Sequence, residues 1–196
     1  MTGSIAHLPG FIAEQAAILE KAGIESAAAE VEWILCSVLE VDRLNLYLHG
    51  VELLNDERFN KIQTIIGRRT TRYPLQYILE ESWFYGRKFF VSPSVMVPTP
   101  ETELLCEQAI RFVRQQQLAT PKILDLGVGS GVIAVTLAIE IPTAFVVGLD
   151  ISNEALAVAR RNATQLCRCF RIEFRQSDFF SAVRPGERFD LIASNP

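Results

Sequence analysis

The sequence predicts an α/β protein with a partial doubly wound, Rossmann-like parallel sheet, preceded by a small helical bundle. Three observations support this fold class. A glycine-rich segment separates a short apolar run at 123–126 from a helical pattern at 132–140. Strand-like and helix-like segments then alternate to the end of the chain, as in parallel sheets. The first 75 residues show only helical periodicity.

Four helical segments with short connections predict a small bundle in residues 1–75. Apolar residues recur at helical spacing in each segment. We expect helices at 9–21, 26–40, 43–48 and from the N-cap Asn55 to the arginines at 68–72, with the third ending at His49-Gly50. The basic cluster of Arg68, Arg69 and Arg72 suits an acidic partner, RNA or compensation of the helix dipole, and we favour the last interpretation.

The chain changes character at Pro74, which breaks the helical pattern. The aromatic run W-F-Y-G-R-K-F-F-V around Gly86 predicts a β-hairpin. Pro98 and Pro100 then enforce an extended chain before the next helix. We therefore expect a helical domain at 1–75, a hairpin linker at 76–98 and an α/β domain at 99–196.

Polar residues follow each of four predicted strands in the α/β domain. We expect these strands at 123–126, 145–149, 170–174 and 189–193, with helices at 101–117, 132–140 and 153–166. The residues at the strand ends are Asp125, Asp150, Asp178 and Asn195. Because the carboxyl ends of parallel strands meet in one crevice, we expect a ligand site there.

The glycine spacing indicates which ligand the crevice holds. A nicotinamide site has G-x-G-x-x-G, whereas this chain has D-L-G-V-G-S-G at 125–131. Asp125 would repel a pyrophosphate but suits a ligand with an ammonium group, such as S-adenosylmethionine. Asp150, at the end of the next strand, is placed to accept hydrogen bonds from a ribose diol. An ordinary strand-to-helix turn is the alternative.

Composition limits the partners and the location. The 196 residues are 49% apolar and 21% charged with a net charge of −4, which argues against a general affinity for nucleic acid but leaves room for a local basic patch. An apolar run of about twenty residues and a signal peptide are both missing from the sequence, so we expect a cytoplasmic protein without a membrane segment. The four cysteines and two histidines form no zinc pattern, and we expect free thiols and no metal.

Five segments together resemble the HemK/PrmC family, the protein-(glutamine-N5) methyltransferases that act on peptide chain release factors. They are Q-Y-I with F-Y-G-x-x-F-x-V at 76–91, V-P-T-P-E-T-E at 97–103, D-L-G-V-G-S-G at 125–131, S-D-F-F at 177–180 and S-N-P at 194–196. The resemblance covers nearly the whole chain. It implies a class I methyltransferase sheet with the strands present in the order 3-2-1-4, S-adenosylmethionine as cofactor, a release factor as protein partner and a monomeric state.

The resemblance also implies roles for single residues. The cofactor-binding set is Asp125, Gly127, Val128, Gly129, Ser130, Gly131, Asp150, Asp178, Phe179 and Asn195. The three glycines would pass beneath the methionine part, Asp150 would hold the ribose, and Asp178 and Phe179 would border the adenine. Asn195 and Pro196 look like the first half of the family's N-P-P-Y motif. The Asn195 side-chain oxygen and the Pro196 carbonyl would accept the N–H groups of the glutamine amide and make its nitrogen more nucleophilic.

The chain departs from the family pattern in three places. Thr99 stands where the family usually has Arg, and Glu80 stands where it usually has Gly. The chain ends at Pro196, before the second proline and the tyrosine, so we expect a C-terminally truncated fragment without measurable methyltransferase activity.

Three other functions compete with this interpretation. The first is an adenine amino-methyltransferase acting on nucleic acid, because an N-P-P-Y motif is also used for methylation of the exocyclic amine of adenine. A non-catalytic fragment that binds cofactor or a partner is the second. A nicotinamide oxidoreductase is disfavoured by the glycine spacing.

Overall fold

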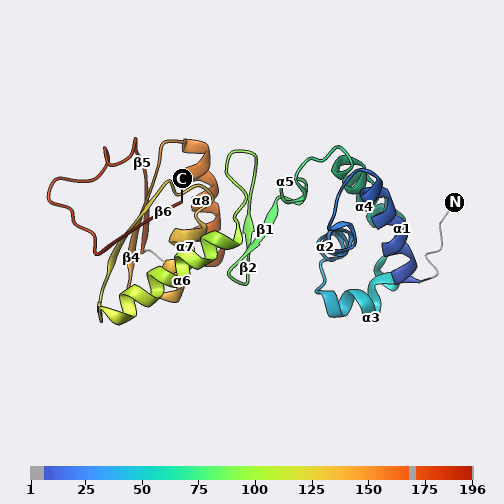
Figure 1. Cartoon of the computed structure of the whole chain (residues 1–196), viewed down its shortest axis with the longest axis horizontal. Helices are drawn as coiled ribbons and strands as arrows, with labels where there is room; N and C mark the ends of the chain where they lie inside the picture. Colours follow the sequence, from blue (N-terminus) through green and yellow to red (C-terminus); the bar gives the residue numbers. More distant parts are fainter. Residues whose placement is uncertain (1–6, 168–170, 196) are drawn as a thin grey trace. The chain divides into compact units, whose positions relative to one another are not determined.

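The chain divides into two compact units between Leu79 and Glu80. The computed structural model describes residues 7–167 and 171–195. The first unit is helical, and the second combines a hairpin with an α/β sheet (Figure 1).

The helical unit encloses its own apolar core. Its helices are α1 (Leu8–Lys21), α2 (Ala27–Leu39), α3 (Arg43–Leu53), α4 (Asp56–Arg69) and the short α5 (Leu75–Leu79). Leu19, Ile34 and Leu46 are among the fully buried residues of this core. The predicted N-cap is confirmed, because Asn55 Oδ1 accepts a hydrogen bond from the Arg58 backbone N at 2.8 Å.

Two features of this unit differ from the sequence prediction. Helix α3 was expected to end at His49-Gly50 but continues to Leu53. A Cβ at Gly50 would lie 2.9 Å from Leu46 Cδ1 and 3.5 Å from Leu8 Cδ2, so this glycine permits close packing inside a helix instead of ending it. The helix α5 was not predicted, and it forms directly after Pro74, whose carbonyl accepts a hydrogen bond from Ile78 N at 3.2 Å.

The predicted β-hairpin is confirmed and belongs to the second unit. Its strands β1 (Glu81–Phe84) and β2 (Arg87–Phe90) pair antiparallel around a turn at Tyr85 and Gly86. Both turn residues have positive φ, as the type I′ turn of a two-residue hairpin requires. The buried rings of Phe84 and Phe89 lie edge to face, with centroids 6.0 Å apart.

The sheet of the second unit contains four parallel strands, β3 (Lys122–Leu126), β4 (Phe145–Asp150), β5 (Ile172–Gln176) and β6 (Leu191–Ser194). Their order is β5-β4-β3-β6, which confirms the predicted order 3-2-1-4. Strands β5 and β6 begin two residues later than predicted. Phe189 was assigned to the last strand, but it lies outside the strand and packs against the sheet cluster of Leu124, Val147 and Leu149.

Three helices cover one face of this sheet: α6 (Pro100–Gln115), α7 (Val132–Glu140) and α8 (Asn153–Leu166). They share a core with the inward side chains of the strands, among them Ile123 and Val146. The other face carries Leu124, Val147 and Leu149, against which parts of the segment 177–190 pack. This segment joins β5 to β6 without a helix (Figure 1). The described residues therefore form one helical layer, where a complete doubly wound sheet has two.

An ionic network fixes the segment 177–190 to the sheet. The Glu187 carboxylate lies 2.7 Å from both Lys122 Nζ and Arg175 Nη1, on strands β3 and β5. Glu173 forms a second ion pair with Arg175 at 2.8 Å. Hydrogen bonds from Arg175 and then from Lys122 hold the pKa of Glu187 well below its usual range. The network thereby anchors the loop that carries part of the candidate site.

Candidate functional site

A cavity of about 200 Å³ lies at the carboxyl ends of the parallel strands. Its walls are Leu126, Gly127, Leu149, Asp150, Ile151, Ser177, Asp178, Phe179 and Ser194. Four of the predicted cofactor residues, Gly127, Asp150, Asp178 and Phe179, thus line one cavity, although they come from three separate segments. Asn195 follows the wall residue Ser194 directly in the chain.

The glycine-rich turn leaves β3 and enters α7 beside this cavity. The backbone N atoms of Gly127 and Val128 both donate to Leu149 O, at 2.9 and 3.0 Å, which ties the turn to β4. Gly131 has a φ of 81°, and a Cβ there would lie 3.0 Å from Ala159 Cβ on α8. Only glycine combines this backbone conformation with such close packing, so α8 lies directly against the turn.

Asp150 joins the turn to the cavity. Its Oδ2 accepts a hydrogen bond from Gly129 N at 2.8 Å, and its Oδ1 accepts one from Ser152 N at 2.9 Å. A carboxylate oxygen has two lone-pair sites, so each oxygen keeps one for a further donor. Asp150 therefore holds the turn in place and can also bind hydroxyl groups in the cavity.

Asp125 lies beneath the turn and has no exposed surface. Its Oδ2 accepts a hydrogen bond from Ala134 N at 3.0 Å in the first turn of α7, whereas Oδ1 has no hydrogen-bond partner among the described residues. Burial raises the pKa of this carboxyl to about 7. The structure thus places Asp125 under the cavity floor, where it can influence a bound cation only through its field.

The segment after β5 forms the outer wall of the cavity. Ser177 N donates to Asp150 O at 2.8 Å, and Ser177 Oγ donates to Phe179 O at 2.7 Å. These bonds hold Phe179 at a φ of 47° with 71% of its surface exposed. The left-handed conformation costs a bulky residue about 1–2 kcal/mol. Local strain of this kind is concentrated at functional sites, where other contacts maintain it.

The candidate acceptor residue Asn195 contacts a motif that lies far away in the sequence. Its Nδ2 donates a hydrogen bond of 2.7 Å to the Oγ1 of Thr102, which is only 4% exposed at the start of α6. No described residue donates to Asn195 Oδ1. Thr102 therefore orients the amide and leaves its oxygen available, a role that the sequence did not predict. Pro196 lies outside the described residues.

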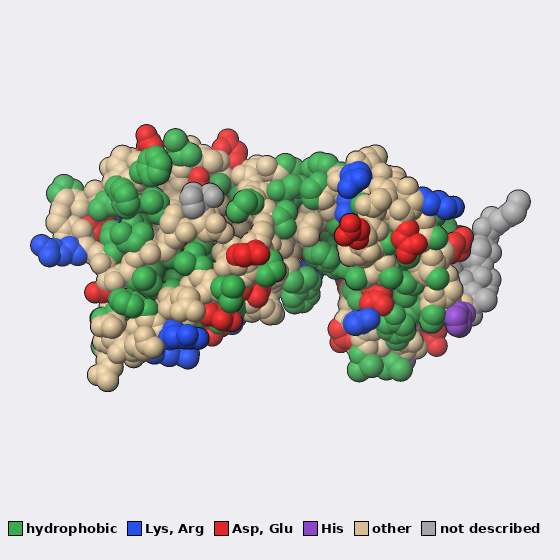
Figure 2. All heavy atoms as spheres, viewed as in Figure 1, with side chains coloured by type: hydrophobic (Ala, Val, Ile, Leu, Met, Phe, Trp, Pro, Cys, Tyr) green, Lys and Arg blue, Asp and Glu red, His purple; other side chains and the backbone are tan. Residues whose placement is uncertain are grey.

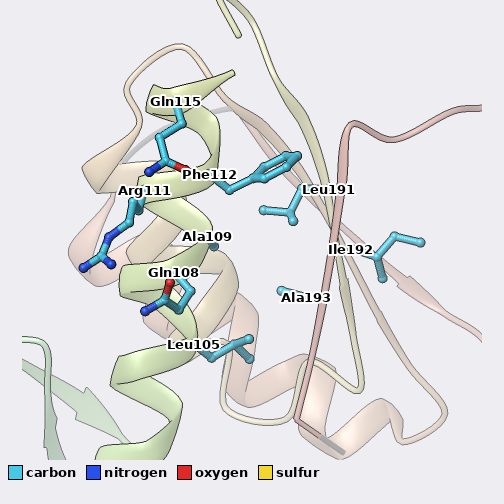
Figure 3. A pocket seen from close by; sticks show the side chains of 9 residues that line it. All are labelled: Leu105, Gln108, Ala109, Arg111, Phe112, Gln115, Leu191, Ile192 and Ala193. Atoms are coloured by element: carbon cyan, nitrogen blue, oxygen red, sulfur yellow. The ribbon is translucent and has the colours of Figure 1, made fainter. Parts of the chain in front are cut away.

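A second, apolar groove lies between α6 and β6 and has a volume of about 340 Å³. Phe112 of α6 and Leu191 of β6 point toward one another across it, whereas Ile192 points to the opposite side of the strand (Figure 3). Within the described residues β6 pairs only with β3, and 53% of the Ile192 surface is exposed. Arg111 is the only charged residue lining the groove, which therefore offers little of the polar chemistry found at the strand ends.

The remaining chemistry of the described residues is limited. They contain no group of three or more His, Cys, Asp or Glu residues able to hold a metal ion. None of the helices in residues 7–167 and 171–195 has both the length and the apolar character needed to cross a bilayer. Acidic and basic side chains are scattered singly or in small groups over the face shown in Figure 2.

The cysteines differ in part from the sequence prediction of free thiols. Cys36 and Cys106 are not part of a disulfide, and burial raises the pKa of the Cys106 thiol to about 12. Cys167, just after α8, is instead disulfide-bonded, so the prediction is wrong for this residue. Cys169 lies outside the described residues.

Comparison with known proteins identifies relatives for both units. The model of the PrmC N-terminal domain matches residues 11–79, and that of a methyltransferase domain matches residues 119–196. The release factor glutamine methyltransferase of Geobacter sulfurreducens is 41% identical over 187 residues, which are 95% of this chain and 61% of that protein. The protein of the same name from Koribacter versatilis is 41% identical over 178 residues, 91% of this chain and 62% of its own length.

The chain thus spans somewhat less than two thirds of the length of the curated relatives it matches. Among solved structures, a 16S rRNA methyltransferase of T. thermophilus in complex with AdoMet and guanosine has a TM-score of 0.49 and 25% identity. The match covers 59% of this chain and 32% of that one. The family resemblance predicted from the sequence is confirmed by the domain matches and the curated relatives.

Proposed function

We propose that the second unit of the chain binds S-adenosylmethionine in the cavity at the strand ends, as expected for a chain that belongs to the HemK/PrmC family. We further propose that this site serves methyl transfer to the side-chain amide nitrogen of a glutamine, the one in the G-G-Q motif of a peptide chain release factor. The observation that supports the proposal most strongly is Asp150, whose carboxylate lines the cavity and at the same time accepts the Gly129 amide.

The residues around the cavity fit the chemical parts of this cofactor. The free lone-pair sites of Asp150 would accept the two ribose hydroxyls. Asp178 and Phe179 would contact the adenine by hydrogen bonding and by packing. The turn at 127–131 would lie against the methionine part, above the buried Asp125. The acidic groups here, with no basic side chain among the cavity walls, suit a ligand with a sulfonium and no phosphate.

The acceptor side of the site is built around Asn195. When bound, S-adenosylmethionine supplies a methyl group on a positively charged sulfur, which makes in-line transfer largely a problem of positioning and electrostatics. An amide nitrogen is a poor nucleophile because its lone pair is delocalised into the carbonyl. Asn195 Oδ1, oriented through Thr102, would accept an N–H of the glutamine and favour a pyramidal nitrogen. The nitrogen loses its proton during or after transfer, so the protein needs no strong general base.

The helical unit would have a different task from the catalytic unit. We assign residues 1–75 to recognition of the release factor, because most of this part of the chain lies in the match to the PrmC N-terminal domain at residues 11–79. Residues 76–98 would link it to the catalytic unit. The protein would act as a monomer in the cytoplasm, where translation termination takes place, and would not need to bind nucleic acid directly.

We expect the 196 residues by themselves to bind cofactor but to turn over too slowly for detection. Among the described residues, Asn195 is the one side chain that the proposal assigns to holding the substrate amide. A single contact leaves the amide free to rotate, and a displacement of about 1 Å can reduce the rate roughly 100-fold.

A chimera tests the proposed function. The 196 residues would be joined to the part of the Geobacter relative that lies beyond the matched region, and the product incubated with S-adenosylmethionine and a release factor. Mass spectrometry should find one added methyl group on the G-G-Q glutamine, and Asn195→Ala in the same chimera should abolish it. Methylated adenine in added DNA, together with an unmodified release factor, would favour the nucleic-acid alternative. Cofactor binding without any methylated product would favour a non-catalytic role.

A further inference from the structure

One buried side chain outside the predicted site connects the hairpin to the glycine turn. Asn162 lies on α8 and has no exposed surface. Its Oδ1 accepts a hydrogen bond from Phe90 N at 2.7 Å, and its Nδ2 donates to Phe90 O at 2.9 Å. The same Nδ2 donates a third bond, of 2.8 Å, to Ser130 O in the turn. Asn162 therefore uses both ends of its amide on two segments that are 40 residues apart.

The hydrogen-bond partners of Asn162 match the amide group of asparagine, which has both an acceptor and a donor. Two of them are carbonyl oxygens and one is an N–H, so the orientation of the amide is fixed by its partners. Aspartate would lose both donated bonds, and an apolar residue would leave three partly or fully buried backbone groups unpaired. Phe90 belongs to β2, which pairs with β1 on one edge, so Asn162 satisfies the opposite edge of the hairpin. The guanidinium of the neighbouring Arg161 lies over the Phe90 ring at 3.4 Å.

The turn residue that Asn162 holds lies between two constrained glycines. Gly129 donates its N–H to Asp150, and Gly131 packs against Ala159 without room for a Cβ. Because Ser130 directly follows Gly129, we expect a movement of Ser130 to shift the Gly129 amide and its contact to Asp150. The position of the hairpin thus affects the position of Asp150, the residue that is proposed to hold the ribose.

The hairpin also reaches the acceptor side of the site. Tyr85 N, in the hairpin turn, donates to Glu103 Oε1 at 2.5 Å. Glu103 follows Thr102, whose hydroxyl accepts the hydrogen bond from Asn195. A continuous set of contacts therefore runs from Asn195 through α6 and the hairpin to Asn162, the turn and Asp150.

We propose that Asn162 is a positioning residue that couples the hairpin to the cofactor-binding turn, so that binding at the cavity orders the hairpin. The inference rests on the proposed cofactor site. Coupling of this kind is reciprocal: the factor by which bound cofactor favours the ordered hairpin equals the factor by which the ordered hairpin raises the affinity for the cofactor. It also gives a protein substrate that engages the linker a route to the cofactor site.

The first experiment needs no variant. Hydrogen exchange of the wild-type 196-residue chain is compared with and without saturating S-adenosylmethionine. The Phe90 amide should exchange about tenfold more slowly with the cofactor, although it lies outside the cavity. Unchanged exchange at Phe90, with slower exchange in the turn, would overturn the coupling and leave the cofactor site intact. Absence of any cofactor binding would overturn the proposed site, and the coupling with it.

Variants then test Asn162 itself. Asn162→Asp keeps the acceptor for Phe90 N, and Asn162→Ser removes the contacts without introducing a buried charge, in case the first variant does not fold. Leu156→Ala is the matched control, because Leu156 is a fully buried residue of the same helix without polar contacts. Calorimetry is done well below the unfolding temperature of each variant. The dissociation constant should rise about tenfold or more for a folded Asn162 variant and less than twofold for the control, and Asn162→Asp should lose the cofactor-dependent protection of Phe90. Equal dissociation constants for all variants, or an equal rise of the dissociation constant in the control, would show that Asn162 has only a structural role.

Discussion

The substitution Asp150→Asn separates the two roles given to this carboxylate. Asparagine has nearly the same shape but offers one oxygen and one NH₂ group in place of two acceptor oxygens. In the wild type the two oxygens face the N–H groups of Gly129 and Ser152. Whichever way the new amide turns, its NH₂ group faces one of these backbone donors. The variant therefore loses a backbone hydrogen bond and the negative charge that would hold the ribose.

The expected loss of affinity follows from the strength of such bonds. A hydrogen bond to a charged group contributes about 1.5–3 kcal/mol. Since about 1.4 kcal/mol corresponds to a factor of ten, the dissociation constant for S-adenosylmethionine should rise roughly 10- to 150-fold. The disturbed Gly129 contact places the result toward the upper part of this range.

Isothermal titration calorimetry at a temperature where both proteins are folded measures this change. Ser152→Ala is the matched control, because it removes the cap hydrogen bond that Ser152 Oγ accepts from Ala155 N in the same loop. That variant should lose about 1 kcal/mol of stability and keep its affinity for the cofactor. Equal affinity of wild type and Asp150→Asn would refute the assignment of Asp150 to the ribose.

Three further predictions concern other parts of the second unit. The pKa of Asp125 is about 7 in the folded protein instead of the usual 3.8, so the folded state keeps this proton at pH values where the unfolded state has lost it. The unfolding free energy of the wild type should therefore fall by about 1–4 kcal/mol relative to Asp125→Asn as pH rises from about 4 to about 7. Parallel curves of unfolding free energy against pH, measured by urea unfolding, would contradict this. Glu80 is exposed and has a φ of 57°, which strains a residue with a side chain. The substitution Glu80→Gly should therefore raise the unfolding free energy by about 0.5–1 kcal/mol. A lower unfolding free energy of this variant in urea would show that the backbone there is not strained. The amides of β6 that face away from β3 should exchange at nearly the rate of an unstructured peptide, and strong protection of a monomer there would mean that the strand edge is covered.

Features carried by short segments could be predicted from the sequence. The glycine turn and the hairpin around Gly86 follow from patterns within some thirty residues, because local backbone demands select the residue types. The strand order, in contrast, was expected only from the family resemblance. Asp150 was found because its position at a strand end is itself a local pattern. The positive φ of Glu80 is consistent with the glycine that the family resemblance leads us to expect at this position.

Residues whose roles arise from packing could not be predicted in this way. Asn162 and Phe90 are 72 residues apart, and Thr102 and Asn195 are 93 apart, so no local pattern relates them. Asp125 stood at a strand end like Asp150, but the packing of α7 buries it completely. A polar residue on the apolar side of α8, between buried Ala159 and half-buried Ala163, was the one sequence signal that pointed to Asn162.

A titration of the isotope-labelled chain with S-adenosylmethionine, followed by two-dimensional NMR, tests the proposed cofactor site most directly. The amide signals of residues 127–131, 150–152 and 177–179 should shift together with one dissociation constant, while signals of the helical unit at 7–79 should stay in place. Titration with NAD under the same conditions should leave the spectrum unchanged. Absence of shifts at millimolar cofactor, or shifts confined to residues away from the strand ends, would contradict a cofactor site at this edge of the sheet.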